Sequence, residues 1–414
     1  MKRKKNKSVS PWRWRAEWLA HRSIEWVLAH LPASWVFHIG EMLGDLAWRF
    51  FKQRRMLAFR NLRIVMGEEH HVQEIEKMTR EVFRRTGANL LSSVHTAKLP
   101  REELAKALLF ENIELLENTY ARGQGIVLLL AHMGNWEMLS RMNLFFPNPN
   151  DLAGLYRPLE NHLINRDVLK RRSADGAQMF SKQESIHRLA GFLKQGGILG
   201  ILADQHVGRG GLTMPLFGRL TKVSPLPSLL ARRAKAEVIA LSLSTVRPGV
   251  WKATFHPVKA QPTTQDCMEG LEHVMRQSLL DVFWLHDRWK LGSTKLRPLS
   301  KWLGDPTMRG SKPHRVLLGI GPLDSSREFS DEWFHPDLVW ELLIVGNASV
   351  PAWFPNECNI HHIGEKASRD EWIQQVEAID HGQPWPLDFI LLDRQISHQS
   401  ALAKATGIKV YQLD

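Results

Sequence analysis

The sequence has little cysteine and no long apolar run, and both absences limit what the chain can be. Cys267 and Cys358 are the only cysteines among 414 residues, which gives neither a disulfide framework nor the spacing of a zinc site. We therefore expect a reducing compartment. No stretch reaches the roughly 18 uninterrupted apolar residues of a membrane-spanning helix. No small-residue cleavage site follows the basic start, so no secretory signal is predicted.

Several catalytic fingerprints are also missing. The 19 histidines form no HExxH pattern and no carboxylate cluster joins them, so no metal is predicted. No GxSxG elbow supplies a serine nucleophile. Gly208, Gly210 and Gly211 are predicted to form a flexible loop, because neither GxxxxGK[ST] nor a strand-linked GxGxxG is present. We therefore expect no cofactor.

The charge is unevenly distributed. Residues 301–414 hold 10 lysines and arginines against 16 acids, a balance of −6, so the net +12 of the chain leaves +18 on residues 1–300. This asymmetry indicates an anionic partner for the first part alone.

Tryptophan is concentrated at the start of the chain. Six of the 16 tryptophans lie in the first fifty residues, next to a basic cluster made of Lys2, Arg3, Lys4, Lys5 and Lys7. Indole rings beside lysines favour a lipid headgroup boundary. A tail that binds nucleic acid, or one that only aids solubility, is the alternative. We predict that residues 1–50 form a membrane-interface segment of one or two helices with Pro32 between them, and that nucleic acid is not a partner.

The most informative segment is His132-Met133-Gly134-Asn135-Trp136-Glu137, which follows the apolar run 126–131. The run predicts a buried parallel strand, and 136–146 is predicted to be helical. Catalytic groups of open α/β sheets gather at the carboxyl ends of strands. His132 can act there as a general base that takes a hydroxyl proton, with Glu137 orienting the imidazole. The alternatives are an ordinary histidine at a strand end and a carboxylate paired with a helix dipole.

These residues carry a family resemblance. AHMGNWE is similar to the signature of the bacterial lipid A biosynthesis acyltransferases, a branch of the HxxxxD/E lysophospholipid acyltransferase superfamily, although an Asp is commoner at the Glu137 position in that superfamily. The other segments that resemble the family are Arg54-Arg55 with Asn61-Leu62, Arg122-Gly123-Gln124-Gly125, Tyr156-Arg157-Pro158 with Asn161, Ala203-Asp204-Gln205, Pro215-Leu216-Phe217-Gly218 and Trp284 to Lys290. The resemblance covers roughly residues 12 to 300 in order.

The resemblance implies an O-acyltransferase at the cytoplasmic face of the cell inner membrane, held there as a peripheral or monotopic protein. It would move a fatty acyl chain from an acyl carrier protein thioester, or from coenzyme A, to a hydroxyl of a lipid A precursor. Acylation of another phospho- or glycolipid remains an alternative. A non-catalytic relative that binds lipid or scaffolds an envelope complex is another.

The resemblance also implies roles for single residues. Arg157 is expected near the acceptor phosphate or the oxyanion, with a surface salt bridge as the alternative. Asn161 is a weaker substrate-binding candidate. Asp204 and Gln205 are expected to shape the pocket by hydrogen bonding, or else to serve a structural loop. Arg288 and Lys290 are either headgroup ligands or solvated charges.

The order of elements predicts an α/β fold with a mixed, mainly parallel sheet covered by helices, as in glycerolipid acyltransferases. We predict an acyltransferase domain over 51–297, a proline-interrupted linker over 298–313 and a small α/β domain over 314–414. Asp393 to His398, with Ala401, faintly resembles a segment of heptosyltransferase-type glycosyltransferases, but the glycine of that segment is absent here. A docking or vestigial domain is the favoured interpretation, so we assign no chemistry to it. Few contacts are expected across the linker.

The strands predicted in the first domain are 126–131, 152–156, 197–203, 236–243 and 251–255.

Overall fold

The computed structural model describes residues 11–148, 151–208, 210–291, 300–321, 329–351, 353–355 and 358–413. The chain divides into two compact units, each built from separate pieces of the sequence. The first unit comprises 1–47, 82–203 and 226–283, and the second comprises 48–81, 204–225 and 284–414. The basic cluster Lys2 to Lys7 lies outside the described residues.

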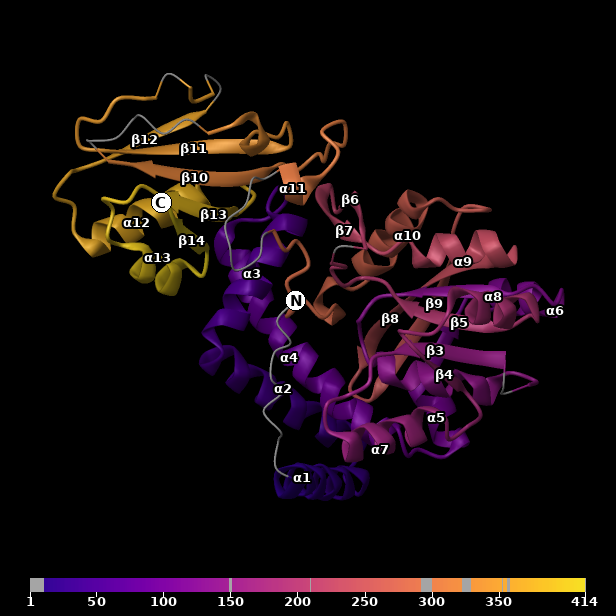
Figure 1. Ribbon diagram of the computed structural model, residues 1–414. Helices are drawn as coiled ribbons and strands as arrows, with labels where there is room; N and C mark the ends of the chain where they lie inside the picture. Colours follow the sequence, from indigo (N-terminus) through magenta and orange to yellow (C-terminus); the bar gives the residue numbers. More distant parts are fainter. Residues whose placement is uncertain are drawn as a thin grey trace. The chain divides into compact units, whose positions relative to one another are not determined.

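A seven-stranded sheet forms the centre of the first unit (Figure 1). Its order is β1-β9-β8-β2-β5-β3-β4, and its neighbours pair in parallel except for the antiparallel hairpin of β8 and β9. The bounds are β1 Leu108–Glu111, β2 Ile126–Leu130, β3 Leu152–Tyr156, β4 Gln178–Ser181, β5 Ile198–Leu202, β8 Glu237–Arg247 and β9 Val250–Pro257. This confirms the mixed, mainly parallel sheet. All five residues of the central strand β2 are buried, as a strand with both faces covered requires.

Helices cover both faces of this sheet. On one side in Figure 1 lie α8 (Ile186–Lys194), α9 (Leu226–Ala234) and α10 (Thr264–Arg276), and α7 (His162–Arg172) lies on the other. The start of α10 is fixed by a capping box between Thr263 and Asp266, and its buried side chains recur every three or four residues. The short helices α5 (Arg101–Ala107) and α6 (Glu114–Ala121) flank β1 in the sequence.

Three further helices lie in the N-terminal part of the chain. They are α1 (Pro11–Ala29), α2 (Ala33–Phe50) and α4 (Val72–Thr96), of which α4 runs from the second unit into the first. The expected break at Pro32 lies between α1 and α2. None of the helices in the described part of the chain is both long and apolar enough to cross a membrane.

The second unit contains the predicted small α/β domain. Its five-stranded sheet is parallel throughout, in the order β12-β11-β10-β13-β14. The bounds are β10 His314–Ile320, β11 Leu338–Val345, β12 Asn359–Ile363, β13 Leu387–Leu392 and β14 Lys409–Gln412, with α12 Arg369–His381 and α13 Gln399–Thr406. The same unit holds α3 (Lys52–Met66), the antiparallel pair β6 (Leu212–Leu216) and β7 (Arg219–Val223), and the short α11 (Ser300–Leu303).

The two units do not coincide with the boundaries predicted from the sequence. Helix α3 and the β6–β7 pair were assigned to the acyltransferase domain, but they pack with the C-terminal sheet. The contact centres on Asp388 of β13, which is fully buried and binds Arg60 of α3, Arg219 of β7 and His314. Arg63 of α3 pairs in the same way with Asp380 of α12. The expectation of few contacts across the linker is therefore wrong for the described residues.

Candidate functional site

His132 lies where the sequence places it, just beyond the carboxyl end of β2. This strand is flanked by β5 and β8, and all three run in the same direction. The imidazole is half-buried and packs edge-on against the Trp136 ring, with 5.3 Å between ring centroids. A parallel sheet thus presents this ring at the edge where ligands of α/β folds bind.

The turn after His132 depends on Gly134. Its φ is 56°, and a Cβ built on it would lie 2.3 Å from the carbonyl oxygen of Leu243 in β8. Only glycine fits, because any side chain would collide with a backbone atom that cannot yield. The next residue, Asn135, is buried and donates to the Thr96 hydroxyl at 2.9 Å. The turn between His132 and Glu137 is therefore held rigidly.

Glu137 lies in the first turn of a 3-10 helix, η1 (Trp136–Phe145), where the sequence predicted an α-helix. Its carboxylate accepts two hydrogen bonds from Arg172, the last residue of α7: Nε to Oε2 at 2.9 Å and Nη2 to Oε1 at 2.5 Å. Such a bidentate pair fixes both the position and the orientation of the carboxylate. Arg172 was not predicted as a site residue, because its only signal in the sequence is the basic run that ends α7. The expected role of Glu137 in orienting His132 stays a prediction.

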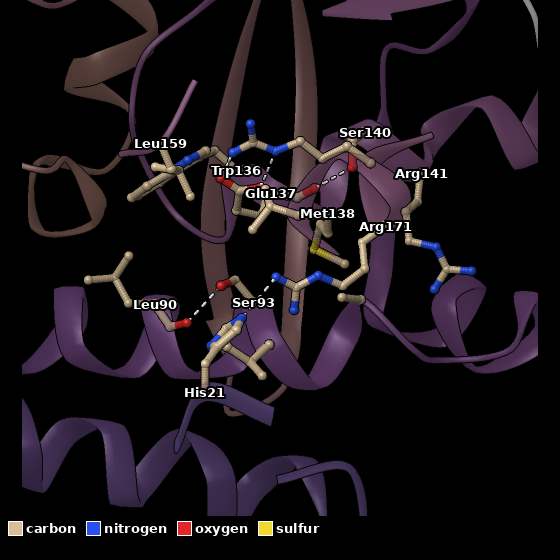
Figure 2. A pocket seen from close by; sticks show the side chains of 14 residues that line it. His21, Leu90, Ser93, Trp136, Glu137, Met138, Ser140, Arg141, Leu159 and Arg171 are labelled. Atoms are coloured by element: carbon tan, nitrogen blue, oxygen red, sulfur yellow. Dashed lines mark hydrogen bonds and ion pairs between the residues drawn. The ribbon is translucent and has the colours of Figure 1, made fainter. Parts of the chain in front are cut away.

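A pocket of about 290 Å³ opens beside this ion pair (Figure 2). Trp136 and Glu137 form one wall, and His21 of α1 and Leu90 of α4 lie opposite them in the view. Burial lowers the pKa of His21, against the opposing effect of the Glu25 carboxylate. The pocket thus combines an apolar wall with charged groups from α1 and α7. Its lining residues are His21, Leu90, Ser93, Val94, Ala97, Trp136, Glu137, Met138, Ser140, Arg141, Leu159, Val168, Arg171 and Arg172.

A second, narrower pocket of about 100 Å³ lies beneath η1 and against the sheet. It shares Trp136, Glu137, Ser140 and Arg172 with the first pocket. The rest of its lining is almost wholly apolar and contains two glycines: Leu128, Leu130, Leu139, Leu152, Ala153, Gly154, Leu155, Met179, Gly200 and Leu202. We call this second pocket the apolar slot, and the Glu137–Arg172 pair lies in its wall close to the end of β2.

Helix α1 is attached to the wall of the first pocket through α7. The Trp18 indole donates to Asp167 at 2.7 Å, and Arg171 pairs with Glu25, which is buried. Asn161 belongs to the same contact. Its side chain caps α7 by accepting from the backbone N–H groups of Leu163 and Ile164, and its amide donates to Trp14 and Glu17 of α1. These contacts give Asn161 a structural role, and its substrate-binding role stays a prediction.

Arg157 lies directly after β3 and is exposed, which leaves its guanidinium accessible to a ligand. Asp204 and Gln205 follow the end of β5 after Ala203 but belong to the second unit. Asp204 is fully buried, and its carbonyl oxygen lies 3.2 Å from Nε2 of His286, whereas Gln205 is exposed. The roles predicted for these three residues are untested.

Arg288 is buried, so it is not a solvated charge. Burial lowers its pKa to about 10, with the Asp204 carboxylate acting in the opposite direction. The guanidinium is therefore still charged at neutral pH. Its Nη1 donates to the carbonyl of Lys222 at 3.3 Å.

The second unit brings together three motifs that are far apart in the sequence. Asn61 of α3 donates to the carbonyls of Trp284 and His286, both at 2.8 Å. Thr221 of β7 donates to the carbonyl of Arg288 at 2.8 Å, and the Trp289 indole donates to that of Leu216 at 3.2 Å. The segment 284–289 is therefore held by hydrogen bonds both to α3 and to the β6–β7 pair.

No group of histidines, cysteines and carboxylates in the described ranges is arranged to hold a metal ion.

Comparisons with known proteins agree with the sequence motifs. The model of a family described as bacterial lipid A biosynthesis acyltransferase matches residues 1–291, which ends before the small α/β domain. A lipid A biosynthesis lauroyltransferase of Escherichia coli (strain K12) is 27% identical over 275 residues, 64% of this chain and 88% of the relative. A palmitoleoyltransferase of the same strain and a lipid A biosynthesis acyltransferase of Shigella flexneri are each 24% identical over the same lengths.

Proposed function

Since the chain belongs to the bacterial lipid A biosynthesis acyltransferase family, we propose that it transfers a fatty acyl chain from acyl carrier protein to a hydroxyl of a lipid A precursor. The observation that carries this proposal is the group at the end of β2: His132 packs on Trp136, and Trp136 lines the apolar slot together with Glu137 and Arg172. Acyl transfer to a hydroxyl needs a general base for the hydroxyl proton, and an apolar pocket nearby suits the acyl chain.

In the proposed reaction His132 takes the proton of the acceptor hydroxyl as its oxygen attacks the thioester carbonyl. The tetrahedral intermediate then collapses, the C–S bond breaks, and the protonated imidazole returns the proton to the thiolate that leaves. No covalent enzyme intermediate is required. Glu137, held by Arg172, would stabilise the imidazolium while it exists.

The apolar slot is proposed to receive the acyl chain. Gly154 and Gly200 keep it open: a Cβ on Gly200 would lie 3.3 Å from the Leu130 side chain, and one on Gly154 would lie 3.1 Å from that of Met179. Both neighbours are flexible ends of side chains, so a small addition is tolerated but takes space from the slot. The length of the acyl chain should therefore depend on these two positions.

We expect Gly200→Val to shift donor selectivity towards shorter acyl chains, because a single methylene in an apolar pocket is worth roughly 10- to 200-fold in discrimination. Competition between two acyl carrier protein thioesters that differ by two carbons measures this. Gly191→Ala is the matched control, since Gly191 of α8 has open space around it and lies outside the slot. Unchanged selectivity in a folded Gly200→Val protein would place the acyl chain elsewhere.

We propose that the protein works at the cytoplasmic face of the inner membrane, as a peripheral or monotopic protein. The support comes from α1 and α2, where large apolar side chains are exposed: Trp12 is 72% exposed, Trp26 64%, Trp35 63% and Met42 73%. Indole rings in such positions suit the headgroup boundary. Because α1 also supplies His21 to the first pocket, a lipid acceptor bound at the membrane surface would be close to that pocket.

Replacing Trp12, Trp26, Trp35 and Met42 together by serine should weaken binding to anionic vesicles by at least about tenfold, because apolar burial drives interfacial binding. Neutralising the basic cluster should instead reduce the salt dependence, at about 1 kcal/mol per charge near the surface. A vesicle sedimentation assay at two salt concentrations separates these effects. Serine at Leu212, Val246 and Ile360, which are exposed outside α1 and α2, provides the control. Equal losses in both proteins would rule out this anchor.

A further inference from the structure

A short backbone pairing holds the His132 loop from one side. Met133 and Val282 form an antiparallel bridge at the end of β2. The N–H of Phe283 donates to the carbonyl oxygen of His132 at 2.8 Å, and the N–H of Gly134 donates to the carbonyl oxygen of Asp281 at 2.9 Å. The backbone around the imidazole is therefore fixed by the segment 281–283, which is almost 150 residues away in the sequence.

The side chain of Asp281 fixes that segment in turn. It is 3% exposed and accepts hydrogen bonds from three residues. Asn89 Nδ2 at 3.0 Å and Thr245 Oγ1 at 2.6 Å donate to Oδ1, while Thr245 N at 2.8 Å and Ser278 Oγ at 2.7 Å donate to Oδ2. The Arg85 guanidinium lies 3.8 Å from Oδ1. A buried carboxylate with four such donors is satisfied and rigid.

Two of the residues that donate to Asp281 lie on a helix and a central strand of the first unit. Asn89 lies on α4 and also accepts from the indole N–H of the fully buried Trp251 on β9, at 2.8 Å. Thr245 lies on β8, next to the central strand. A helix and two neighbouring strands thus define the position of one carboxylate. That carboxylate sets the backbone that pairs with the His132 loop.

We propose that Asp281 is a positioning residue for acyl transfer, which holds His132 and the turn to Glu137 in the geometry that proton transfer requires. This inference rests on the proposed function of His132. Asp281 acts through the backbone: its carboxylate is occupied by Asn89, Thr245 and Ser278, and its carbonyl meets Gly134. A displacement of about 1 Å at a catalytic group can cost on the order of 10²-fold in rate. Disturbing the hydrogen bonds of Asp281 should therefore lower the rate of acyl transfer.

The test is Asp281→Asn in the full-length protein, which keeps the shape but turns one acceptor oxygen into a donor that faces other donors. We expect kcat to fall on the order of 10²-fold, while the KM for acyl carrier protein thioester and acceptor lipid stays nearly constant, since ground-state binding is not altered. Hydrogen exchange of the peptide that contains Gly134 should become faster. Thr245→Val, which removes one donor and keeps the backbone N–H, should give a smaller effect of the same kind.

The matched control is Glu341→Gln. Glu341 is an equally buried carboxylate with several donors, from Arg315 and His361, but it lies in the C-terminal sheet. Loss of kcat and faster exchange at Gly134 in Asp281→Asn and Thr245→Val, but not in Glu341→Gln, supports the proposal. Wild-type kcat and exchange in folded Asp281→Asn overturn it, as does an equal loss of kcat in the control. If Asp281→Asn does not fold, Thr245→Val decides by the same two readouts. A fully active His132→Ala protein would refute the proposed general base. The hydrogen-exchange measurement would still test whether Asp281 holds the backbone at Gly134.

Discussion

A chain that ends at residue 310 is expected to lose its fold. The truncation removes Asp388 and Asp380, which are the partners of Arg60, Arg219 and Arg63. It also removes the neighbours of buried apolar side chains, because Leu220, Leu291 and Leu303 pack in one cluster with strands β10, β11 and β13. Exposing one buried leucine to water costs about 1.5–3 kcal/mol, and the truncation exposes several such side chains together with the ion pairs. That loss is comparable to the whole stability of a typical domain.

Circular dichroism and thermal unfolding of residues 1–310 and of the full chain test this expectation. Asp388→Ala should lower the unfolding temperature strongly, whereas Asp370→Ala, an exposed carboxylate on α12 of the same domain, should not. A soluble 1–310 fragment that unfolds cooperatively and keeps full turnover would contradict the structural role given to the small α/β domain.

His132→Ala is expected to reduce acyl transfer by about 10² to 10⁴, the usual contribution of a general base. Glu137→Gln should produce a loss of the same kind, mainly in kcat, because the role proposed for the carboxylate is to stabilise a charge that forms only during the reaction. Arg172→Gln should follow Glu137→Gln, since its two hydrogen bonds fix that carboxylate.

Steady-state kinetics of the purified variants, with unfolding temperatures measured in parallel, give the comparison. Arg166→Gln is the control on α7, because Arg166 is exposed and outside both pockets. Near wild-type acyl transfer by His132→Ala would show that His132 is not the general base. Full activity in Arg172→Gln together with loss in Glu137→Gln would show that the ion pair is not what places the carboxylate.

Much of the first sheet could be predicted from local patterns. The strands β2 and β5 are continuous apolar runs because both of their faces are covered, and such runs are visible in the sequence. The strands β1 and β4 were missed since they are four residues long and each exposes part of its surface at an edge of the sheet. Their pairing depends on neighbours that are distant in the sequence rather than on their own composition.

The site was predicted only in part for a related reason. His132 and Glu137 are close in the sequence, so one motif shows both. Arg172 is 35 residues beyond Glu137, and Arg219 is 169 residues before Asp388. Nothing in the local sequence distinguishes these arginines from the many lysines and arginines that remain in solvent. The same limit explains the boundary expected at 298–313, because proline and polar residues mark a chain segment as irregular but do not show what packs across it.

Mass spectrometry of a lipid A precursor, incubated with the purified full-length protein and an acyl carrier protein thioester, would show the proposed acyl transfer itself. We expect the precursor to gain the mass of one acyl chain with the wild-type protein, and we expect this product nearly to disappear with His132→Ala. A precursor of unchanged mass, under conditions where the folded wild-type protein acylates another phospho- or glycolipid, would contradict the proposed acceptor. No acylation of any lipid by the folded protein would contradict the proposed chemistry itself.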